Sequence, residues 1–168
     1  SLGIVLEKVL PFANIPQTWQ DTVATIILDI RLPRVLLAGL VGVALAIAGA
    51  TYQGLFRNPL ADPYLIGVAQ GASLGAVCGF LLQVSWDIAG MGVIPLFAFS
   101  GALAATVTVY LLARVGKTLP VTTLILAGVA LGALLGSIVS YLIISSGEKM
   151  HGIIFWLMGS FSLSRWVE

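Results

Sequence analysis

Long apolar stretches alternate along this chain with short polar clusters, which sets the pattern of helices to expect. Each stretch supplies the ~20 apolar residues that a helix needs to cross a hydrocarbon core about 30 Å thick. Overall, 59% of the residues are hydrophobic and 9% are charged, whereas in soluble domains about a quarter are charged. We therefore predict an all-α, polytopic membrane helix bundle with about four spans, over residues 35–56, 63–82, 94–113 and 121–145.

The segments outside these spans are more polar or too short to cross a bilayer. Residues 1–10 resemble the end of an earlier helix, and the absence of an initial Met suggests part of a longer protein. Residues 11–34 carry Asp21 and Asp29, which makes them too polar to span. Residues 150–160 are apolar but short, which favours a short helix at the membrane surface.

The most polar cluster is the heptapeptide RNPLADP, residues 57–63, between the first two spans. Asn58 precedes Pro59 and Asp62 precedes Pro63, so each Pro follows a residue that caps helices well. A capping oxygen accepts a hydrogen bond from an unpaired amide, and Pro in the first turn has its backbone angle already fixed. The cluster predicts the end of one helix, a short turn and the start of the next helix.

Two stripes of glycine recur at a spacing of four residues, on one face each of the second and fourth spans. Small residues at this spacing let membrane helices approach closely, so helix packing is the favoured interpretation. Lining of a pathway is the alternative, and the two are compatible. The stripes consist of Gly67, Gly71, Gly75 and Gly79, and of Gly128, Gly132 and Gly136.

Candidate catalytic and metal-binding groups are few. The string Gly71-Ala-Ser73-Leu-Gly75 matches a nucleophile elbow, but it lies in an apolar span with no preceding strand. The single cysteine, Cys78, excludes a multi-cysteine metal site within the chain. No basic run resembles a nucleic-acid-binding stripe. We predict no catalytic residue, no metal site and no nucleic-acid partner.

Alternation of the spans divides the polar segments between two membrane faces. Face A holds Lys8, Arg31, Arg34, Lys149 and Arg165, and face B holds Arg57, Arg114 and Lys117. The positive-inside rule applied to this count would make face A cytoplasmic. The face A segments are long, however, and the rule weights short turns most, so charge alone leaves the sidedness open.

The strings RLPR, GxxLAxAG and NPLADP within residues 31–76, together with residues 124–142 and FWLMGS at residues 155–160, carry a resemblance to a known family. The chain resembles the permease subunits of ABC importers for iron-siderophore, haem and cobalamin, the FecCD or vitamin B12-type permeases. The resemblance implies the N-terminal half of a permease with about ten spans, in the inner or plasma membrane, with face A extracytoplasmic.

The resemblance also implies partners and residue roles. A second permease copy would complete a homodimer, two ATPase subunits would supply ATP and Mg²⁺, and an outer binding protein would deliver the substrate. Arg31 and Arg34 match arginines that face the binding protein in similar transporters. Val121 and Thr122 match positions that narrow the cytoplasmic side of the pathway, and we expect the turn with Asn58, Pro59, Asp62 and Pro63 on that side. No cofactor is expected in this chain.

The sequence is also compatible with two other functions. A secondary transporter or channel is disfavoured because no charged residue lies within the spans, where ion relays place their carboxylates. A natural half-permease with an assembly role is another alternative. The sequence does not distinguish siderophore, haem and cobalamin as ligands.

Overall fold

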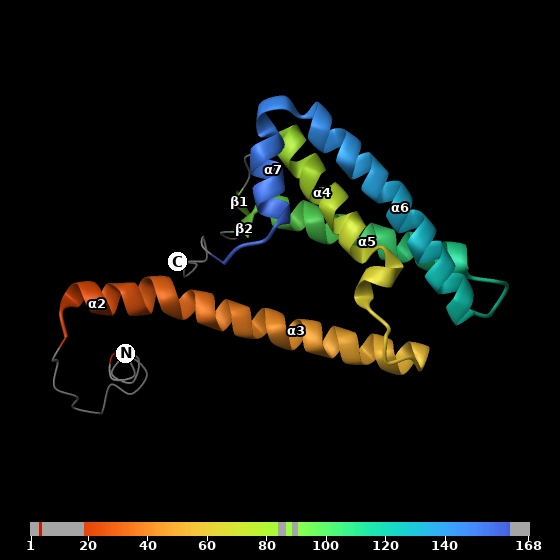
Figure 1. The fold of residues 1–168 in the computed structure, drawn as a ribbon, viewed down its shortest axis with the longest axis horizontal. Coiled ribbons are helices and arrows are strands. Elements are labelled where there is room, and N and C mark those ends of the chain that lie inside the picture. The colour runs from red at the N-terminus through yellow and green to blue at the C-terminus, as the bar shows by residue number, and fades with distance from the viewer. Residues whose placement is uncertain (1–3, 5–18, 84–86, 89–90, 162–168) are drawn as a thin grey trace. The chain divides into compact units, whose positions relative to one another are not determined.

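The computed structural model describes residue 4 and residues 19–83, 87–88 and 91–161 (Figure 1). Lys8, Arg165 and most of the predicted helix end at residues 1–10 lie outside the described residues. The chain forms two compact units, residues 1–46 with 160–168 and residues 47–159. Each is described by itself below.

The first unit is dominated by one continuous helix that runs on into the second unit. It consists of α2 (Asp21–Thr25), the π-helical turn η1 (Ile26–Arg31) and α3 (Leu32–Phe56), and together these form an apolar helix of 36 residues. We expected the first span to begin at residue 35, and that expectation was wrong. The helix begins at Asp21, after Gln20 in an extended conformation.

The π-helical turn explains how the helix continues through Pro33. A proline inside an α-helix lacks one amide donor, and its ring clashes with the carbonyl four residues earlier. Here the amide of Leu32 bonds to the carbonyl of Ile27, five residues back. This wider turn lies directly before Pro33 and makes room for its ring. Pro33 is therefore an interior residue of the helix.

In the described part of the second unit there are four more α-helices and a small β-ladder. They are α4 (Val68–Leu82), α5 (Val93–Ala113), α6 (Val121–Ser145) and α7 (Met150–Leu157), with the 3-10 turns η2 (Pro63–Ile66) and η3 (Gly147–Lys149). The strands β1 (Asp87–Ile88) and β2 (Met91–Gly92) pair antiparallel, with Asp87 opposite Gly92. Helices α5 and α6 occupy the ranges expected for the third and fourth spans.

The expected second span is not one helix. The 3-10 turn η2 ends at Gly67, whose φ of 70° is left-handed, and α4 starts after it. Glycine adopts this conformation without steric cost, so the chain changes direction here and the α-helical part shortens to 15 residues. The prediction of a continuous helix from Pro63 was wrong for this reason.

Two apolar clusters hold the ends of α6 against the other helices of the second unit. The first joins the end of α3 and η2 to α5 and α6, through Phe56, Ala61, Ile66, Val109, Ala113 and Leu124. The second joins α4, α6 and α7 through Val77, Val139 and Ile153, of which Val77 and Ile153 are fully buried.

The described helices confirm the prediction of an all-α membrane fold. Among them, 3 are long and apolar enough to cross a membrane, namely the helix Asp21–Phe56, α5 and α6, and α4 is a shorter apolar helix. The apolar side chains that remain exposed on α5 and α6, such as Phe99, Leu111 and Leu126, suit a lipid or helix environment, because lipid is as apolar as Leu.

Candidate functional site

The heptapeptide predicted as a helix stop begins with a left-handed residue that ends α3. Arg57 has a φ of 49°. Its amide bonds to the carbonyl of Gly54 at 3.3 Å, and the amide of Asn58 bonds to that of Gln53 at 3.2 Å. These two bonds form a Schellman motif with Arg57 where glycine is usual. Two of the last carbonyls of α3, those of Gln53 and Gly54, are thereby satisfied.

The two side chains identified as caps both bond to the backbone two residues ahead. The Oδ1 atom of Asn58 accepts from the amide of Leu60 at 3.0 Å, which closes a turn over Pro59. The Oδ1 atom of Asp62 accepts from the amide of Tyr64 at 2.8 Å, and Pro63 occupies the first turn of η2. Asp62 therefore caps a 3-10 turn and not the long helix that we expected.

The loop between α5 and α6 lies at the same end of the second unit as this turn. The first apolar cluster contains residues next to both, since Ala61 and Ile66 pack with Ala113 and Leu124. The two segments assigned to face B by sequence are therefore neighbours in the structure. Val121 and Thr122, the expected pathway-narrowing pair, form the exposed first turn of α6.

The α5–α6 loop has a defined shape of its own. The backbones of Val115 and Thr118 exchange hydrogen bonds of 3.0 and 3.1 Å, and Gly116 between them has a φ of 62°. The Nε atom of Arg114 donates to the Gly116 carbonyl at 3.0 Å. Pro120, in an extended conformation, then precedes α6. Both short loops at this end therefore contain a left-handed residue and a hydrogen-bonded turn.

The first glycine stripe brings the backbones of α4 and α5 into contact. A Cβ atom at Gly71 would collide with the Gly101 carbonyl and the Ala105 side chain, and one at Gly75 with the carbonyl of Phe97. Conversely, a Cβ at Gly101 would collide with the carbonyl of Gly71. Such close approach is what small residues permit in membrane helices.

The second stripe makes a contact with α4 and η2 that loosens along α6. A Cβ atom at Gly128 would collide with the backbone of Leu65. At Gly132 the nearest atom would be the Cα of Gly67 at 3.6 Å, and at Gly136 it would be Oε1 of Gln70 at 3.7 Å. The helices are therefore tightest near the Gly67 break and wider apart further along.

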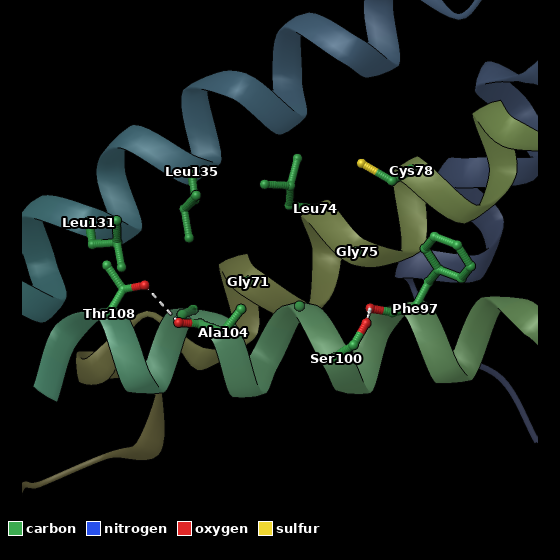
Figure 2. Close-up of a pocket in the computed structure, with 12 residues that line it drawn as sticks. Gly71, Leu74, Gly75, Cys78, Phe97, Ser100, Ala104, Thr108, Leu131 and Leu135 are labelled. Atoms are coloured by element: carbon green, nitrogen blue, oxygen red, sulfur yellow. Dashed lines mark hydrogen bonds between the residues drawn. The ribbon is translucent and has the colours of Figure 1, made fainter. Parts of the chain in front are cut away.

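A pocket of about 430 Å³ opens where α6 diverges from α4 and α5 (Figure 2). Gly71, Gly75 and Gly101 contribute backbone to its lining, and Leu131 and Leu135 reach in from α6. Cys78 is also part of the lining.

The hydroxyl groups in this pocket are already used inside their own helix. Ser100 donates to the carbonyl of Phe97 at 2.9 Å and Thr108 to that of Ala104 at 2.8 Å, as the dashed lines in Figure 2 show. A hydroxyl satisfied in this way has less to offer a ligand. The pocket is therefore more apolar than its composition suggests.

Arg31 and Arg34, the residues expected to face a binding protein, belong to the first unit. Arg31 is exposed at the end of η1 and Arg34 is half-buried in the first turn of α3. Residues three apart on a helix are neighbours on one side, so the two guanidinium groups share a side of this helix. Among the described residues, no group of three or more His, Cys, Asp and Glu side chains is placed to hold a metal ion.

Several residues that shape this site were missed in the sequence. Gly101 lies in a run of small residues, SGALAA, that would have indicated a packing face on the third span. The left-handed conformation of Arg57 has no signal in its residue type. Gly67 was assigned only to packing, although a glycine four residues after Pro63 could also have indicated a break.

The architecture and the turn geometry can be compared with known proteins. The family model described as the FecCD transport family matches residues 2–168 of the sequence. The chain belongs to the FecCD transport family. The resemblance inferred from RLPR and NPLADP is thereby confirmed.

Curated FecCD relatives are permeases from several organisms. The cobalamin import system permease protein BtuC of Halobacterium salinarum is 45% identical over 153 residues, covering 91% of this chain and 39% of the relative. The Fe(3+) dicitrate transport system permease protein FecD of Escherichia coli is 41% identical and the hemin transport system permease protein HmuU of Yersinia pestis is 40% identical, with 41% and 44% of each relative covered. The chain thus spans about 40% of the length of these curated relatives.

A solved structure shares the FecCD fold. It is described as an inward-facing conformation of a metal-chelate type ABC transporter and is 32% identical to this chain, with a TM-score of 0.75. The match covers 98% of this chain and 53% of the other. This FecCD chain is therefore part of an integral membrane protein that crosses the inner membrane several times.

Proposed function

We propose that the chain is part of the translocation subunit of an ATP-driven ABC importer for iron chelates, with siderophore or haem as ligand, or for cobalamin. Membership of the FecCD transport family carries this proposal. It is supported by relatives that are permeases for cobalamin, Fe(3+) dicitrate and hemin.

The proposal includes partner subunits and assigns a separate role to each. A second permease copy and two ATPase subunits complete the membrane complex, and a binding protein on face A delivers the substrate. ATP is bound and hydrolysed by the ATPase subunits, so this chain is not an enzyme. Arg31 and Arg34 face the binding protein, while the RNPLADP turn and residues Val121 and Thr122 lie on the cytoplasmic side. The joining of these last two segments by one apolar cluster supports their common side.

Transport in proteoliposomes tests this function. The complete permease that contains this chain is reconstituted with its ATPase subunits and binding protein, and uptake of cyanocobalamin, hemin and a ferric siderophore is measured separately. We expect uptake of one ligand class that requires both ATP inside the vesicle and the binding protein. A control with a hydrolysis-deficient ATPase should abolish it. Equal uptake without ATP would instead indicate a secondary transporter, and no uptake of any ligand would contradict the proposal.

A further inference from the structure

The corner between α6 and α7 places a charged side chain at the end of a different helix. Helix α6 ends at Ser145, and Gly147, with a φ of 61°, turns the chain into η3. Lys149 is the last residue of η3 and is half-buried. Its Nζ atom donates to the carbonyls of Phe80 at 3.5 Å and Leu81 at 3.2 Å.

These two carbonyls belong to the last turn of α4, where the backbone needs partners. The last four carbonyls of any α-helix have no amide partner inside the helix. They also carry the negative end of the helix dipole, which favours a cation. Lys149 supplies two donors and a positive charge at this place, and its flexible stem lets it reach from η3.

Helix α7 itself packs on α4 through apolar side chains. Ile153 is fully buried with Val77 and Val139. The rings of Phe80 and Trp156 meet edge to face, with centroids 6.4 Å apart. Apolar burial is not directional, so by itself it constrains the rotation of the short helix only loosely. Hydrogen bonds are directional, and those from Lys149 can select one rotation.

We propose that Lys149 is a positioning residue that straps α7 to the carboxyl end of α4. Figure 1 shows α7 beside that end of α4. The strap fixes the direction of the exposed side chains of α7 and its C-terminal cap, among them Phe155 and Met158, which are 75% and 78% exposed. This inference rests on the contacts within the second unit and does not depend on the transported ligand.

Spin labels on the two helices test the strap in the complete permease that contains this chain, purified in lipid nanodiscs. In a Cys78→Ser background, Leu82→Cys on α4 and Phe155→Cys on α7 carry the labels, because both side chains are exposed. We expect one narrow distance distribution for the native Lys149 and for Lys149→Arg. Lys149→Met keeps the apolar stem but removes the donors, and we expect it to broaden the distribution.

Hydrogen exchange of the α7 amides gives a second readout. Hydrogen bonds from a charged group are stronger than neutral ones, so exchange should be roughly tenfold faster or more in Lys149→Met. Lys117→Met, which removes an exposed cation of the α5–α6 loop, is the matched control. A label pair at Leu103 and Leu126 verifies that α5 and α6 remain packed.

The outcomes separate the strap from general effects. An unchanged distribution and unchanged exchange in Lys149→Met would overturn the proposal, as would the same change in Lys117→Met. If Lys149→Met does not accumulate in membranes, Lys149→Gln keeps one donor group. It should give intermediate broadening if the strap is correct, and native behaviour if it is not.

Discussion

A methyl group at Gly75 would occupy space that the backbone carbonyl of Phe97 already fills. The two residues lie on α4 and α5, and their contact is backbone against backbone. Neither partner is the far end of a flexible side chain, so the helices themselves must move if this space is taken. The approach of α4 to α5 therefore depends on the absence of a side chain at this position.

We expect Gly75→Ala to lower the thermal unfolding midpoint of the complete permease in detergent. Overpacking of a tight contact costs about 1–3 kcal/mol, more than the up to ~1 kcal/mol that Ala gains over Gly in a helix. Gly49→Ala in α3 is the matched control, because no atom lies within 4 Å of a Cβ there. Equal midpoints for the two variants would show that a side chain at Gly75 does not destabilise the contact between α4 and α5.

Arg57→Gly should stabilise the protein, because Arg57 ends α3 in a left-handed conformation that glycine adopts freely. The expected gain is about 1 kcal/mol, from the strain that a left-handed non-glycine residue carries. Arg57→Ala removes the same charge but retains the strain, so it should bring no such gain. A similar gain in both variants, measured as midpoints of thermal unfolding, would assign the effect to the charge.

Asp62→Ala should destabilise the turn before α4, since it removes the acceptor of the Tyr64 amide. Loss of a capping oxygen costs about 1 kcal/mol. Asp62→Asn keeps an oxygen at the same place and should stay close to the native stability. If Asn were as destabilising as Ala, the carboxylate charge would be the important property and not the hydrogen bond.

The double change Arg31→Glu and Arg34→Glu should weaken binding of the proposed binding protein to the complete permease. Both arginines lie on one side of their helix, so the double change removes two positive charges from one surface. Salt screens the attraction between exposed charges, over a length of about 10 Å at 0.1 M. The loss of affinity should therefore be largest at low salt and smaller near 1 M. Surface plasmon resonance with nanodiscs measures it, and Lys117→Glu on face B is the control. Unchanged affinity at low salt would contradict the docking role.

The long helices and the capped turn could be predicted because their signals are local. Helix α6 coincides with an apolar stretch bounded by Pro120 and Ser146, and the Asp62 side chain caps the turn that its position before Pro63 indicated. Family membership followed from the same strings.

The features that the sequence did not reveal depend on contacts between distant segments. The break at Gly67 packs against Gly128 and Gly132 of α6, and the hydrogen bond from Lys149 to α4 joins residues 68 positions apart. The π-helical turn before Pro33 was missed for another reason. An X-Pro pair usually indicates a helix boundary, and here a change of helix type overrides that rule.

The shortness of α4 creates a mismatch with the bilayer. Its 15 residues extend over roughly 22 Å at 1.5 Å per residue, less than the ~30 Å of hydrocarbon that lipid tails provide. Irregular backbone at membrane depth is tolerated only where protein covers it. Helix α6 covers the Gly67 break through Gly128, so we expect Gly128→Leu to bring polar backbone into contact with lipid. Lipid accessibility of a spin label at Leu65 would measure this exposure, and an unchanged value would show that another part of the protein shields the break.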